Sequence, residues 1–149
     1  MKEIHMSTPT GTARRPQSDA AAPLRTVLRI DGWSTAVFGV VMLAAARPLS
    51  GPLGLPTAWS IPFGVAMLGG AAALGLIAGY PRIPARYVAL VVAGNALSCV
   101  ALVVLAFAGV IPLTGLGVAF LLVGALVVAV YAGLELRGLR RLVRHGAAA

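Results

Sequence analysis

Two acidic residues, Asp31 and Glu135, are the candidates for acid–base chemistry in this sequence. Each lies where a long apolar stretch meets a polar segment, so we expect the two carboxylates to face each other across one mouth of a helical bundle. Paired carboxylates in different environments act as general acid and general base. The structural alternative is that Asp31 caps the start of a helix and Glu135 pairs with an arginine. The arginines within its reach are Arg82, Arg86, Arg137 and Arg140.

Asn95 is the deepest polar residue that the sequence places inside the membrane. It lies eight residues into the uncharged stretch Tyr87–Gly109, roughly 12 Å deep by helical rise. Ser98 and Cys99 follow one turn later on the same helical face. This pattern indicates either a polar pocket for a substrate group or an ion, or an interhelical hydrogen bond worth about 1 kcal/mol.

Two hydroxyl side chains lie one turn inward from the acidic residues, Thr35 from Asp31 and Tyr131 from Glu135. Both are substrate-binding candidates because they would extend a polar track from the mouth of the bundle into its interior. An ionisable or polar group in a membrane span is a functional-site hypothesis by default.

The sequence offers no residue set for a metal or an organic cofactor. Its histidines, His5 and His145, lie in the terminal segments, and no apolar stretch contains lysine. The single cysteine, Cys99, cannot form an intrachain disulfide or a thiolate metal site, so it is expected to pack at a helix interface. Phosphate loops and metalloprotease or hydrolase motifs are also absent. We therefore expect no cofactor and no metal.

Long apolar stretches are the elements that must position these residues. Hydrophobic residues make up 59% of the 149-residue chain and charged residues 11%, whereas about a quarter of a soluble domain is charged. Roughly 20 apolar residues cross the bilayer hydrocarbon as a helix. The sequence predicts an all-α, four-helix transmembrane bundle over 24–136, between a disordered polar tail (1–23) and a basic C-terminal tail (137–149). The predicted spans are about 30–46, 58–80, 87–109 and 115–134.

The net charge of +8 sets the expected orientation. The basic residues flank the apolar stretches and do not line one exposed face, so nucleic acid is not an expected partner. Four spans place every basic residue except Arg47 on one side, and the positive-inside rule then predicts that both termini are cytoplasmic. The expected location is a bacterial inner membrane. Arginines near the C-terminus are expected to anchor lipid headgroups: Arg137, Arg140, Arg141 and Arg144.

Small residues recur every four positions in the second and fourth predicted spans. Such rows let two helix backbones approach closely in lipid, so we expect them to pack helices, in a homo-oligomer or against a partner membrane protein. The rows are Ala71, Gly75 and Gly79, and Ala125, Ala129 and Gly133.

Several short motifs resemble those of a group of small four-span bacterial integral membrane proteins. They are the segment LRTVLRID (24–31), a GLP turn (54–56), Asn95, LTGLG (113–117) and GLRR (138–141). The resemblance covers about residues 24–141. It implies the four-span topology and no particular activity.

Three functions are compatible with the sequence. The first is a non-enzymatic accessory or scaffold subunit that packs through its small-residue rows. The second is an intramembrane enzyme for a lipophilic substrate such as an isoprenoid, with Asp31 or Glu135 as the acid and Asn95 orienting the substrate. The third is a small-solute transporter that works as an oligomer.

Overall fold

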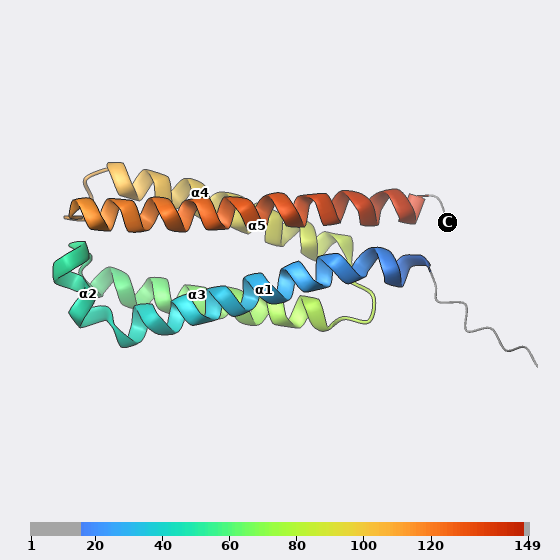
Figure 1. Ribbon diagram of the computed structural model, residues 1–149, viewed down its shortest axis with the longest axis horizontal. Helices are drawn as coiled ribbons and strands as arrows, with labels where there is room; N and C mark the ends of the chain where they lie inside the picture. Colours follow the sequence, from blue (N-terminus) through green and yellow to red (C-terminus); the bar gives the residue numbers. More distant parts are fainter. Residues whose placement is uncertain (1–15, 148–149) are drawn as a thin grey trace, which may run out of the picture.

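The computed structural model describes residues 16–147, which form five helices and no strand (Figure 1). Four of the helices are long and apolar enough to cross a membrane. The predicted all-α four-helix bundle is therefore confirmed for the described residues, and the chain is a small multi-pass membrane protein. The helices are α1 Pro16–Ala44, α2 Ala46–Leu53, α3 Thr57–Gly79, α4 Ala85–Phe107 and α5 Gly115–Ala147.

The first and last long helices extend well beyond the predicted spans. Helix α1 begins at Pro16, well before the predicted span start near residue 30, and α5 continues to Ala147, beyond the predicted end at 134. Of the predicted disordered tail, residues 1–15 lie outside the described part of the chain and residues 16–23 are helical. As a consequence, Asp31 and Glu135 both lie within helices and not at their ends.

The bundle consists of two antiparallel hairpins. Helix α1 packs mainly on α3, and α4 packs mainly on α5, while α1 and α5 hold the two hairpins together (Figure 1). Helices α3 and α4 touch over a short length only. The start of α1 and the end of α5 lie at the same end of the bundle, as an even number of spans requires.

At the opposite end, the short helix α2 docks against the start of α5. Thr114 caps α5 by accepting a hydrogen bond from the Gly117 backbone N–H (3.1 Å), and its hydroxyl donates to the Pro52 carbonyl (2.6 Å). Gly54 ends α2 with φ +62° and lies directly against the backbone of 112–114, where any side chain would overlap. The GLP and LTGLG motifs thus join the two hairpins at this end.

Two apolar clusters fill the two ends of the bundle and leave its middle for polar residues. The cluster near the chain ends contains Leu24, Leu28 and Val88, each at most 1% exposed. The other contains Met42, Leu53, Leu55 and Ile111. On α1 the two clusters are separated by the segment that carries Asp31.

A close approach of α1 and α3 uses glycines outside the predicted rows. A Cβ on Gly64 of α3 would lie 2.7 Å from Leu43 and 3.0 Å from the Gly39 carbonyl of α1. Of the predicted rows, Ala125 is buried and Ala71 half-buried. The remaining four residues are exposed on the outside of the bundle, so they do not pack helices within one chain: Gly75, Gly79, Ala129 and Gly133.

Candidate functional site

Two acidic residues and one amide of the long helices meet between the two hairpins. Asp31 comes from α1, Asn95 from α4 and Glu135 from α5. Asn95 lies ten residues after the start of α4 and twelve before its end, so it is about 15–18 Å from either end by helical rise. The expectation that both acidic residues lie at the mouth of the bundle was wrong, because α1 begins earlier and α5 ends later than predicted.

One side-chain amide bridges the two carboxylates. Asn95 Nδ2 donates hydrogen bonds to Asp31 Oδ2 (3.0 Å) and to Glu135 Oε2 (2.9 Å). An amide nitrogen carries two hydrogens, so each carboxylate accepts one. The bridge connects three helices, and it crosses from one hairpin to the other through Asp31.

Hydroxyl groups extend this cluster on the α1 side. Thr35 Oγ1 donates to Asp31 Oδ1 (3.1 Å), while Ser34 Oγ donates to the Asp31 carbonyl (3.0 Å) and lies 3.3 Å from the hydroxyl of Tyr131. Thr35 and Tyr131 therefore belong to the cluster as a polar track. Ser34 was not among the residues predicted from the sequence, although its position three residues after Asp31 puts it on the same helical face.

Both carboxylates of the cluster are buried, so they depend on these hydrogen bonds in place of water. Asp31 is 3% exposed and Glu135 is 0% exposed. Asp31 sits inside α1, so it does not cap a helix start. Glu135 is bonded to Asn95 and not to an arginine, and its second oxygen, Oε1, is the one buried side-chain polar atom without a hydrogen-bond partner among residues 21–144. A buried carboxylate oxygen without a donor is costly, so this oxygen is free for a proton or a ligand.

Two other candidates lie outside the cluster. Ser98 is exposed, whereas Cys99 is half-buried. The arginines at positions 137, 140, 141 and 144 are exposed on the last turns of α5, a helix segment that continues the fourth span.

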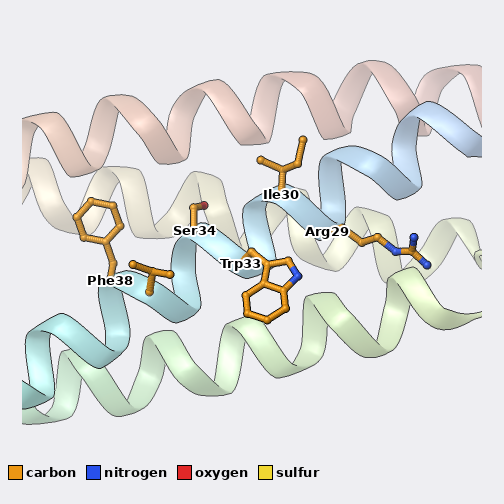
Figure 2. Close-up of a pocket in the computed structure, with 6 residues that line it drawn as sticks. Arg29, Ile30, Trp33, Ser34 and Phe38 are labelled. Carbon is orange, nitrogen blue, oxygen red and sulfur yellow. The ribbon is translucent and has the colours of Figure 1, made fainter.

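A groove runs along the outer side of α1 next to the cluster (Figure 2). Its volume is about 560 Å³. Ser34 is the only uncharged polar residue in it, and it connects the groove to Tyr131 and to the backbone of Asp31. The groove is lined by Arg29, Ile30, Trp33, Ser34, Val37 and Phe38.

The arrangement is suited to holding a proton. It places two acidic groups on the two hydrogens of one amide in a medium that cannot solvate charge. The part of the chain that the structure describes contains no group of three or more histidine, cysteine or acidic side chains that could hold a metal ion. No protein-family model matches this chain, and comparisons with the curated proteins and with the solved structures gave no match.

Proposed function

We propose that this membrane protein takes up and releases a proton at the Asp31–Asn95–Glu135 cluster and that it works as a small proton-coupled transporter. The observation that carries the proposal is the single amide shared by two buried carboxylates from different hairpins. Intramembrane acidic residues commonly mark proton relays and substrate paths in transporters.

The first step of the proposed mechanism is proton binding by the pair of carboxylates. Two carboxylates that share one site do not both ionise readily, because each negative charge disfavours the other. We infer that the pair shares one proton at neutral pH. Glu135 Oε1, which has no hydrogen-bond donor, is the oxygen that is open to it.

The second step of the proposed mechanism is a movement of one hairpin relative to the other, because the cluster lies between them. Asn95 bonds Asp31 across the two hairpins, and the Ser34–Tyr131 bond crosses the same boundary. Loss of the shared proton leaves two negative charges on neighbouring carboxylates, and their mutual repulsion favours a rearrangement of the bonds that hold Asp31 and Glu135 on one amide. A proton gradient would thereby bias the position of one hairpin relative to the other, which is what coupled transport requires.

Infrared spectroscopy of the protein in lipid vesicles tests the proposal. The carbonyl stretch of a protonated carboxyl group is separate from that of a carboxylate, and the chain has only four acidic residues to contribute. We expect one carbonyl band that disappears as the pH is raised and that Glu135→Gln removes.

Asp19→Asn is the matched control. It removes another acidic residue of α1, outside the cluster, and should leave this band in place. A wild-type spectrum without a titrating band would overturn the proposal. So would a band that survives both Glu135→Gln and Asp31→Asn.

We also propose that both termini face the cytoplasm of a bacterium, with the chain in the inner membrane. The support is the distribution of charge over the described helices. Arg25, Arg82, Arg86 and the arginines of α5 belong to the end where α1 begins and α5 ends, whereas Arg47 belongs to the other. The α5 arginines are then placed to bind anionic headgroups.

A second candidate function, as an accessory or scaffold subunit, is favoured by the outward position of the small residues. Gly75 and Gly79 are exposed on α3, with nothing within 4 Å of a Cβ added at either. We expect the double substitution Gly75→Leu and Gly79→Leu to convert a homo-oligomer to monomer, as measured by light scattering in detergent. Gly69→Leu, equally open, is the control. An unchanged mass in the double variant would exclude these glycines as an assembly surface.

A further inference from the structure

We propose that the groove on α1 binds one anionic phospholipid, whose phosphate pairs with Arg29 and whose acyl chain lies over Trp33 and Val37. The groove and its arginine are separate from the carboxylate bridge, so this site does not depend on the proposed proton exchange. Three observations support the inference: Arg29 lacks a hydrogen-bond partner within the described part of the chain, it lies near the membrane interface, and the apolar surface beside it has the length of one leaflet.

Arg29 is the one charged residue of the groove, and it is exposed. One turn earlier, Arg25 donates to the carbonyls of Tyr80 (2.9 Å) and Pro81 (3.3 Å). Arg29 has no such partner among residues 21–144, the part of the chain whose side chains the structure describes. A guanidinium at the edge of the hydrocarbon needs acceptors, and a phosphate offers it two parallel hydrogen bonds.

The depth of Arg29 fits a headgroup. Arg25 is level with the end of α3 at Gly79, as its bonds to the next two residues show. Arg29 lies one turn, about 5–6 Å, deeper. Its side chain points along α1 toward the start of that helix, away from Trp33 (Figure 2). This direction brings the charge to the membrane interface, where phosphates lie.

The rest of the groove fits an acyl chain. Ile30, Trp33, Val37 and Phe38 are each between 45% and 75% exposed. From Arg29 to Phe38 the helix rises roughly 13 Å, close to the roughly 15 Å hydrocarbon depth of one leaflet. A charged head and a continuous apolar tail surface of leaflet length describe a phospholipid and not a water-soluble ligand.

Quenching of Trp33 by brominated lipids tests the site. The chain has two tryptophans, and Trp59→Phe leaves Trp33 as the sole reporter while it keeps an aromatic ring against Phe63. In vesicles of the full-length chain, we expect brominated phosphatidylglycerol to bind beside Trp33 about fivefold more tightly than brominated phosphatidylcholine, as one arginine contributes near a membrane surface.

Arg29→Gln should bring the two lipids to equal affinity, whereas Arg47→Gln, at the other end of the bundle, should keep the preference. Equal quenching by both lipids in the Trp59→Phe protein would overturn the proposal, because the groove would then hold annular lipid without selection. A preference that survives Arg29→Gln would overturn it as well, since other arginines would hold the headgroup.

Discussion

Replacing Asn95 with leucine is expected to lower the free energy of unfolding of the purified protein by about 3 kcal/mol. Leucine has the same number and branching of side-chain heavy atoms as asparagine, so the change removes the amide's hydrogen bonds and no packing atoms. Asp31 Oδ2 and Glu135 Oε2 would each lose their hydrogen-bond donor while remaining buried. Unfolding in a mixed-detergent series, followed by circular dichroism, measures the effect.

Ser98→Leu is the matched control, because Ser98 lies one turn along α4 and is exposed. We expect a change within about 0.5 kcal/mol for it. A triple variant with leucine at positions 31, 95 and 135 distinguishes two quantities. One is the cost of leaving two buried carboxylates without their donor, and the other is the net contribution of the whole cluster to stability. Replacement of a whole buried charged cluster by apolar residues is often neutral or stabilising, so the triple variant should regain most of the loss. Equal stabilities of Asn95→Leu and Ser98→Leu would show that the bridge does not hold the hairpins.

The fold was predictable because the lengths of the apolar stretches determine it. Four such stretches, too long and too uncharged for a soluble core, require four membrane-spanning helices. The even number of spans also places the two ends of the bundle correctly, with the start of α1 and the end of α5 together.

The depth of the acidic residues was not predictable from hydropathy. Arg25 and Arg29 make 24–30 look like a segment outside the membrane. In the structure, Leu24 and Leu28 on the adjoining, inward face of the helix are at most 1% exposed, and Arg25 is satisfied by backbone carbonyls of Tyr80 and Pro81. Charged residues mark the end of a span only where the protein does not supply their partners.

The same reasoning explains the end of α5. Leu139 and Leu142 lie beyond Glu135 and pack against the apolar cluster that contains Leu24 and Leu28. The bundle therefore continues past Glu135, which becomes an interior residue. The periodicity of α5 contains this information, but a hydropathy average over basic neighbours hides it.

The direction in which the small-residue rows face could not be predicted from the sequence. A four-residue period shows that small residues share a helical face, but it does not show which way that face points. Gly75 and Gly79 point outward, whereas the close contact of α1 with α3 depends on Gly39 and Gly64. Only the packing of one helix on another distinguishes the two cases.

The pH dependence of stability is expected to differ strongly between the wild-type protein and Glu135→Gln. If the pair shares one proton in the folded state, unfolding into a solvated state at neutral pH releases that proton. The folded state then binds more protons than the unfolded state, so stability falls as pH rises, by up to about 1.4 kcal/mol per pH unit for one proton. Unfolding curves between about pH 5 and pH 9 measure this slope.

Glu135→Gln removes one carboxyl group and keeps the side-chain length, so Asp31 retains the Asn95 and Thr35 hydrogen bonds without a competing charge. Its stability should vary little with pH over this range. The two histidines, His5 and His145, are present in both proteins, so their contribution cancels in the comparison. Parallel curves for the two proteins would mean that no proton is shared. A steeper fall in wild type than in Glu135→Gln would identify the bridged carboxylates as the proton-binding group, because no other titratable side chain differs between the two.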